Sequence, residues 1–254
     1  MNLMLMEMGI LLFFVSMIIF AIIRQTKKVI STKKRQSLVK HYKRITETDT
    51  VLKHATSLAF STRLVILLHE RIISSLKAIL VVDPKQEKIK LHINQHYNLI
   101  SATKISPATG LFVEPVDERI AIDLARSISR LKTILHSELN EKNISLEDCN
   151  AEEAKLEKIR LKLRISNCLI KATVFFEREN YNISIKMLND NIALIEAVDI
   201  KDEFLIEKHD QMIILLNKST YQLAELEAKN EQLKQLEKPE NASTLDTLFD
   251  QKQR

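Results

Sequence analysis

The feature that most constrains the fold of this chain is its shortage of glycine, because its 254 residues include only Gly9 and Gly110. Sandwiches, barrels and doubly wound sheets need glycine where a turn requires a positive φ. Phosphate-binding loops need glycine as well. With 45% hydrophobic and 28% charged residues, the composition therefore predicts an all-α protein and argues against most nucleotide-dependent enzymes.

Residues 1–23 form an almost wholly apolar segment, interrupted only by Glu7, Gly9 and Ser16 after the first two residues. A helix that crosses a bilayer needs about 20 such residues. The segment has no basic residue before it and no small-residue cleavage site after it, which favours an uncleaved anchor over a secretory signal peptide. A buried core helix is the remaining alternative. We expect residues 1–23 to be the transmembrane helix of a single-pass membrane protein.

Residues 24–46 carry positive charge without a single acidic residue. The cations are Arg24, Lys27, Lys28, Lys33, Lys34, Arg35, Lys40, Lys43 and Arg44. The positive-inside rule then leaves the N-terminus outside and the bulk of the chain in the cytoplasm. We expect these cations to contact anionic lipid at the membrane surface. Nucleic-acid binding is the alternative, although among these residues only Tyr42 offers a stacking surface for bases.

Apolar residues recur at helical spacing through most of the chain after residue 46. The pattern predicts helices over residues 61–82, 84–103, 117–140, 145–178, 181–197 and 202–237. Asp117, Ser145 and Asp202 are the residues expected to begin three of them. The predicted organisation is a first helical hairpin at 47–103, a linker loop at 104–116, a repeat-like helical domain at 117–238 and a disordered tail at 239–254.

Residues 165–198 resemble a tetratricopeptide repeat, which is a helical hairpin of about 34 residues. The positions expected to pack the hairpin hold Ala172, Phe175, Tyr181, Ser184 and Leu188. The repeat's usual tryptophan position holds Cys168, and its terminal proline is missing. Since about three repeats are normally needed for stability, we expect repeat-like antiparallel hairpins without a full array.

The last predicted helix carries a short heptad pattern. One position holds Met212, Ser219, Leu226 and Leu233, and the next holds Leu216, Leu223, Asn230 and Glu237. Because three of these eight residues are polar, we interpret the pattern as a coiled-coil-like helix that packs on its own domain, with self-association into a homo-oligomer as a hypothesis. In the tail, Leu245, Leu248 and Phe249 alternate with polar residues and are candidates to dock into a partner's groove. A chance amphipathic patch is the alternative.

Groups that could carry chemistry are few. Cys149 and Cys168 have neither metal nor redox spacing and are expected to be structural or surface thiols. His69 begins the sequence HERII, but a zinc protease needs a second histidine at position 73, where isoleucine stands. His92 and His96 lie one helical turn apart without an identifiable third ligand, and we expect both to be solvated. The sequence therefore predicts no catalytic residue, no cofactor and no metal site.

The layout as a whole resembles a group of uncharacterised bacterial inner-membrane proteins that are sometimes labelled DNA-repair-related. Its most specific pieces are RQTKKVISTKKR after the apolar segment and LKAILVVDP at the end of the first predicted hairpin. The resemblance implies an inner (plasma) membrane location and transfers no catalytic residue. We expect a non-enzymatic adaptor or scaffold that presents a helical domain to a cytoplasmic protein. The alternatives are a membrane-tethered nucleic-acid-associated protein that uses residues 24–44, and a helical enzyme of an unrecognised kind.

Overall fold

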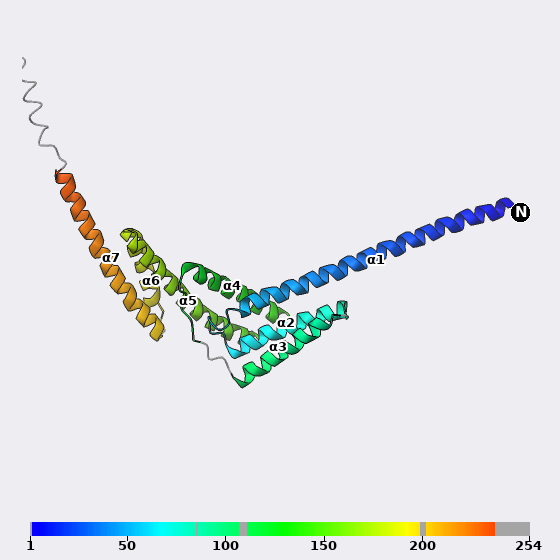
Figure 1. Cartoon of the computed structure of the whole chain (residues 1–254), viewed down its shortest axis with the longest axis horizontal. Coiled ribbons are helices and arrows are strands. Elements are labelled where there is room, and N and C mark those ends of the chain that lie inside the picture. Colours follow the sequence, from blue (N-terminus) through cyan, green and yellow to red (C-terminus); the bar gives the residue numbers. More distant parts are fainter. Residues whose placement is uncertain (1, 85, 107–110, 199–201, 237–254) are drawn as a thin grey trace, which may run out of the picture. The chain divides into compact units, whose positions relative to one another are not determined.

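The protein is all-helical in the computed structural model, which describes every residue except 1, 85, 107–110, 199–201 and 237–254 (Figure 1). In these described residues there are seven helices and no strands. The helices are α1 (Asn2–Leu52), α2 (Thr62–Val82), α3 (Glu87–Ile105), α4 (Glu118–Asn140), α5 (Leu146–Glu177), α6 (Tyr181–Glu196) and α7 (Glu203–Leu236). The predicted all-α class is confirmed.

The starts of several helices are fixed by the capping side chains that the sequence contains. The Oγ atom of Ser145 accepts a hydrogen bond from the backbone N–H of Asp148 at 3.1 Å, ahead of α5. An Asp117 carboxylate oxygen accepts from the N–H of Ile120 at 2.8 Å, ahead of α4. Such bonds satisfy backbone donors that have no partner within the helix. The predicted starts of these two helices therefore have the expected local cause.

Helix α1 runs without a break to Leu52, well beyond the transmembrane helix predicted for residues 1–23. No secondary structure was assigned to residues 24–46 from the sequence. Residues 24–36 are exposed along the helix, whereas Leu38, Ile45 and Leu52 are partly buried. These three residues are spaced by seven, which places them on one face of the helix.

Among the residues that the structure describes, no helix combines enough length with enough apolar character to cross a membrane. Residues 2–23 of the predicted anchor belong to α1, but of their side chains only those of Met17 and Phe20 are described. The anchor therefore stays a prediction.

The chain divides into two compact units. Unit 1 comprises residues 1–113 and 126–155, and unit 2 comprises residues 114–125 and 156–254. Helices α4 and α5 each contribute residues to both units. Gly110 and the adjoining part of the expected linker loop, as well as the expected tail at 239–254, lie outside the described residues. The boundaries that were predicted along the chain stay predictions.

The helices α1, α2 and α3 build an apolar cluster of unit 1. Helix α2 packs against the C-terminal part of α1 on one side and against α3 on another (Figure 1). The buried members of the cluster are Ile72, Ile73, Leu76, Ile79, Ile89, Ile93 and Ile100. Leu38, Ile45 and Leu52 of α1 pack against it, so the end of α1 belongs to the core of unit 1.

The apolar core of unit 2 comes from α5, α6 and α7. Its buried members are Ile165, Cys168, Ala172, Leu188, Ile192, Leu205, Met212 and Leu215. Small residues stand where these helices approach one another. The Ser184 hydroxyl on α6 donates to the backbone oxygen of Ala172 at 3.0 Å, and it lies 3.4 Å from the hydroxyl of Ser219 on α7. All three residues are fully buried.

Candidate functional site

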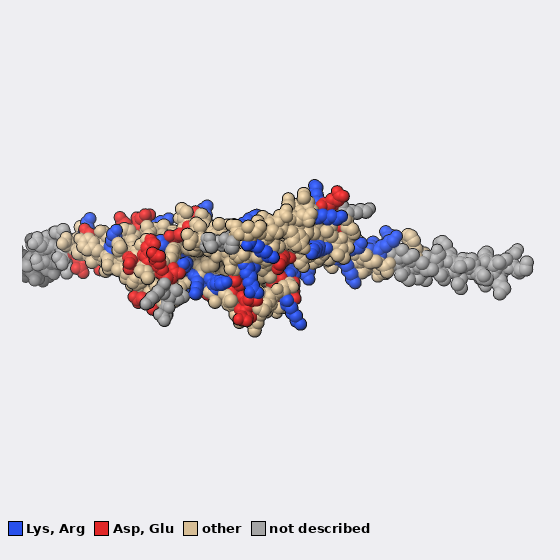
Figure 2. All heavy atoms as spheres, turned by 90° about the horizontal axis from the view of Figure 1, so that it is seen from below, with Lys and Arg blue, Asp and Glu red and all other residues tan. Residues whose placement is uncertain are grey.

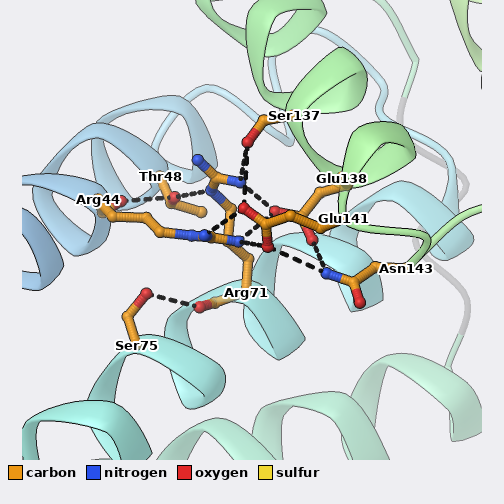
Figure 3. A network of polar contacts seen from close by, with 8 residues as sticks. All are labelled: Arg44, Thr48, Arg71, Ser75, Ser137, Glu138, Glu141 and Asn143. Carbon is orange, nitrogen blue, oxygen red and sulfur yellow. Dashed lines mark hydrogen bonds and ion pairs between the residues drawn. The ribbon is translucent and has the colours of Figure 1, made fainter.

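A dense network of polar side chains lies inside unit 1, where α1, α2 and the end of α4 meet (Figure 3). Its members are Arg44 and Thr48 from α1, Arg71 and Ser75 from α2, Ser137 and Glu138 from α4, and Glu141 and Asn143 from the turn after α4. We call these eight residues the Arg–Glu network. They come from positions up to about a hundred residues apart, so only the fold brings them together.

Two guanidinium groups share one carboxylate at the centre of the network. The Arg44 Nη2 atom lies 2.6 Å from Oε1 of Glu138, and the Arg71 Nη1 atom donates to the same oxygen. Arg44 also binds both carboxylate oxygens of Glu141, at 2.6 and 2.7 Å. The side chains of Arg71 and Glu138 are only 7% and 2% exposed. Two positive and two negative charges therefore balance one another, with Arg71 and Glu138 buried and Glu141 at the exposed edge.

Neutral polar groups complete the network. The Nε atom of Arg71 donates to the Thr48 hydroxyl at 3.2 Å. The side-chain amide of Asn143 donates to the second oxygen of Glu138 at 2.6 Å, while the Asn143 backbone N–H donates to the Glu138 backbone oxygen. The turn after α4 is thus folded back onto the carboxylate. Such hydrogen bonds are what a buried ion pair needs in order to offset its loss of water.

The ion pairs also change how firmly the charged groups hold their protons. Hydrogen bonding to Glu141 raises the pKa of Arg44, and the same bond lowers the pKa of the Glu141 carboxyl. Both shifts favour the charged forms. The network is therefore a fixed, charge-balanced link between helices, and its groups are not poised for proton transfer.

A small hollow of about 240 Å³ adjoins the network. It is lined by Glu47, Arg71, Arg130, Thr133, Ile134 and Ser137. Pockets that take drug-sized ligands usually measure about 300–1,000 Å³ and are mostly apolar. The hollow is thus suited to water or a small polar solute.

The predicted lipid-contacting cations divide into two groups. Arg24, Lys27, Lys28, Lys33, Lys34, Arg35, Lys40 and Lys43 are exposed along α1. On the face drawn in Figure 2, blue side chains mark the part of α1 next to the grey segment. Arg44 was expected to belong with them, but the structure places its guanidinium group in the Arg–Glu network, with 17% of the side chain exposed. Its charge is paired with Glu138 and Glu141 within unit 1.

The residues predicted to pack the repeat-like hairpin lie in unit 2. Ala172, Ser184 and Leu188 are fully buried, and Phe175 and Tyr181 are partly buried. The ring that contacts Tyr181 belongs to Phe176, with ring centres 5.5 Å apart and an edge-on arrangement. Ala172, Ser184 and Leu188 therefore meet at one junction between α5 and α6, where the aromatic residue packed against the cluster is Phe176 in place of the expected Phe175.

The heptad pattern of α7 changes its environment along the helix. Met212 and Ser219 are fully buried in unit 2, but Leu226 and Leu233 are 39% and 49% exposed. The first half of the pattern packs within the unit, and the second half is left on the surface. The candidate docking residues Leu245, Leu248 and Phe249 lie outside the described residues.

Two histidines meet between α2 and α3, in a pairing that the sequence analysis missed. Their Nδ1 atoms, on His69 and His96, are 2.9 Å apart. Burial, together with the neighbouring His96, lowers the pKa of His69 to about 4. His92 is exposed, as expected, whereas His96 is partly buried. His69 and His96 meet because α2 and α3 pack side by side across the turn at Asp83. An antiparallel pairing of these two helices is the pattern that would have predicted the contact.

Both cysteines are buried free thiols. Cys149 is 1% exposed and Cys168 is 4% exposed. Burial raises the pKa of each thiol, for Cys168 to about 11. The Cys168 thiol donates to the backbone oxygen of Met187 at 3.4 Å. Neither thiol is activated as a nucleophile.

Comparisons of the chain with protein-family models, curated proteins and solved structures found no match. The resemblance to single-pass inner-membrane proteins therefore stays an expectation.

Proposed function

We propose that the chain is a non-enzymatic adaptor or scaffold, anchored in the bacterial inner membrane by residues 1–23. The observation that carries the proposal is the three-part character of α1. An apolar stretch at its start is followed by the exposed basic residues 24–36, and then by residues that pack into the core of unit 1. This order suits a helix that joins a membrane anchor to a folded body.

The exposed cations support the orientation with the N-terminus outside and the bulk of the chain in the cytoplasm. Eight of the nine expected cations remain exposed along α1. A basic group near an anionic bilayer surface contributes about 1 kcal/mol to binding. Positive charge directly after the first membrane span also favours retention of that side in the cytoplasm.

The helical body supports a role in protein binding. The hairpin of α5 and α6 keeps the small buried residues expected of a tetratricopeptide-like junction, Ala172 and Ser184. On α7, the exposed side chains of Ile214, Tyr221 and Leu233 are available to a partner helix or to a second copy of the chain. The charged groups of the Arg–Glu network are already neutralised by one another, which fits a scaffold better than an enzyme.

The anchor is tested by extraction of membranes from cells that express the full-length chain. We expect the protein to sediment with membranes and to resist alkaline carbonate. The double variant Leu11→Arg/Ile18→Arg should release it, because arginine is costly at the centre of a bilayer. The matched control Ile30→Arg/Val39→Arg changes two exposed residues of the same helix and should keep it bound. Extraction of the unaltered protein by carbonate would contradict the anchor.

The adaptor role is tested by photo-crosslinking in intact cells, with the crosslinking residue placed at Tyr221. We expect protein adducts that survive nuclease treatment, and none at the exposed Arg160 on α5. Adducts from a crosslinking residue placed within residues 24–36 that nuclease removes, with none from Tyr221, would support the nucleic-acid alternative instead.

A further inference from the structure

Three side chains capable of binding a metal ion, none of them a member of the Arg–Glu network, converge in unit 1. They are His136 on α4, and Cys149 and Glu153 on α5. One potential ligand atom from each lies within 4.8 Å of the other two. The Nε2 atom of His136 is 2.9 Å from a carboxylate oxygen of Glu153. No other group of three such side chains within this range occurs among the described residues.

The local fold explains why these residues meet. Cys149 and Glu153 are four residues apart, so they stand one turn apart on the same face of α5. The short turn between α4 and α5 then brings His136 opposite that face. The turn is held by the hydrogen bond from Asn143 N–H to the Glu138 backbone oxygen at 2.9 Å and by the Ser145 cap.

The neighbouring acids Asp148 and Glu152 on α5 bind other residues, whereas Glu153 does not share these partners. Asp148 binds the guanidinium group of Arg63, and Glu152 binds Ser61 at 2.8 Å and Lys155 at 2.8 Å. Glu153 instead faces His136, with a quarter of its side chain exposed. The buried thiol of Cys149 lies on the inner side of this pair, and the largely exposed imidazole lies on the outer side.

The donor atoms are a sulfur, an imidazole nitrogen and a carboxylate oxygen. This combination suits Zn²⁺, which binds Cys, His and Asp or Glu at about 2.0–2.3 Å in tetrahedral geometry. Mg²⁺ and Ca²⁺ prefer oxygen ligands alone, so the thiol disfavours them. We propose that His136 Nε2, Cys149 Sγ and the Glu153 carboxylate bind one Zn²⁺ ion, with a fourth position open to water.

Binding requires the Cys149 thiol to lose its proton to solvent as the sulfur–zinc bond forms, while the imidazole binds in its neutral form. Without an ion, burial and the negative charge of Glu153 both raise the pKa of this thiol. A dication at the same place reverses that balance by attracting the thiolate. The ion would then join α4 to α5 beside their connecting turn.

The site is tested with the full-length protein, purified in nonionic detergent and stripped of metal, by titration with Co²⁺ followed by Zn²⁺. We expect one equivalent of Co²⁺ to produce a thiolate-to-cobalt charge-transfer band, which Zn²⁺ then abolishes. Cys149→Ser should remove the band. Cys168→Ser is the matched control, because it alters the other buried thiol and should leave the band unchanged.

Two surface variants keep the test decisive if Cys149→Ser fails to fold. The variants are His136→Gln, at a largely exposed residue, and Glu153→Gln, at a partly exposed one. Glu147→Gln, at an exposed residue of α5, is the control. We expect each of the first two to weaken Co²⁺ binding at least about tenfold, and the control to bind like the unaltered protein. Absence of a band in the folded unaltered protein, or unchanged binding in both ligand variants, overturns the proposal.

Discussion

The two units join their helices by different means. In unit 1 the buried charges of Arg71 and Glu138 lie between α2 and α4, whereas in unit 2 the small residues Ala172, Ser184 and Ser219 let α5, α6 and α7 approach closely. A buried charge is tolerated only while its partners remain, so unit 1 depends on the identity of a few groups. Close packing tolerates no added volume, so unit 2 depends on the small size of Ala172, Ser184 and Ser219. The two dependences can be separated by experiment.

The largest effect is expected from Glu138→Gln, which leaves Arg44 and Arg71 without their shared charge. Removing one partner of a buried ion pair usually costs about 3–5 kcal/mol of stability. Hydrogen exchange measured by mass spectrometry on the full-length chain should show this loss in unit 1 while unit 2 keeps its protection. Glu141→Gln, at a more exposed carboxylate, is the control with the smaller expected loss. Equal loss in both units would remove the contrast between them.

A smaller effect is expected from Ser184→Leu in unit 2. The added side chain has no space between α6 and α7, and overpacking of this kind typically costs about 1–3 kcal/mol. Asn182→Leu makes a similar addition at an exposed position of the same helix and should change stability little. The same exchange measurement applies, now with the loss confined to unit 2. A stability equal to that of Asn182→Leu would show that small size is not what the junction requires.

The smallest loss of stability is expected when the pH is lowered, and it should again fall in unit 1. His69 has a pKa of about 4 in the folded protein and an ordinary value of 6.5 when unfolded, because burial and His96 disfavour its charged form while Asp49 only partly opposes them. The unfolded chain therefore binds more protons, so stability should fall as the pH drops from 6.5 toward 4. Between pH 6.5 and 5 the expected loss is about 1–2 kcal/mol.

The acid effect is measured by urea unfolding at several pH values, with local exchange to assign it to unit 1. His69→Gln carries no titrating group at this position and should flatten the dependence. A stability that rises on acidification, or the same slope in His69→Gln, would rule out His69 as the cause.

Much of the helical structure could be predicted because it depends on local patterns. Apolar spacing and capping side chains such as Asp117 and Ser145 place the helices after residue 61 to within a few residues. The continuity of α1 was harder to predict, since Leu38, Ile45 and Leu52 are spread thinly through a highly charged stretch. Their regular spacing is the signal that was available.

The polar clusters could not be predicted in the same way, because each depends on pairing between distant segments. Arg44 has the same appearance in the sequence as the exposed cations before it, although it binds Glu138, 94 residues later. The sequence shows that Cys149 and Glu153 are one helical turn apart on α5. His136 joins them only because the loop between α4 and α5 folds the two helices together. A buried charged residue leaves no local mark that distinguishes it from a surface one.

The unbroken course of α1 has a mechanical consequence for a chain held at a bilayer. Residues 24–37 span about 20 Å at the rise of an α-helix, several times the thickness of one headgroup layer. In the proposed orientation this segment acts as a rigid spacer that sets the height of unit 1 above the lipid. One inserted residue would change that height by about 1.5 Å and turn unit 1 by about 100° around the helix axis. The height of unit 1 above the lipid and its rotation about the helix axis are therefore coupled. A partner bound to the same membrane would meet a defined face of unit 1.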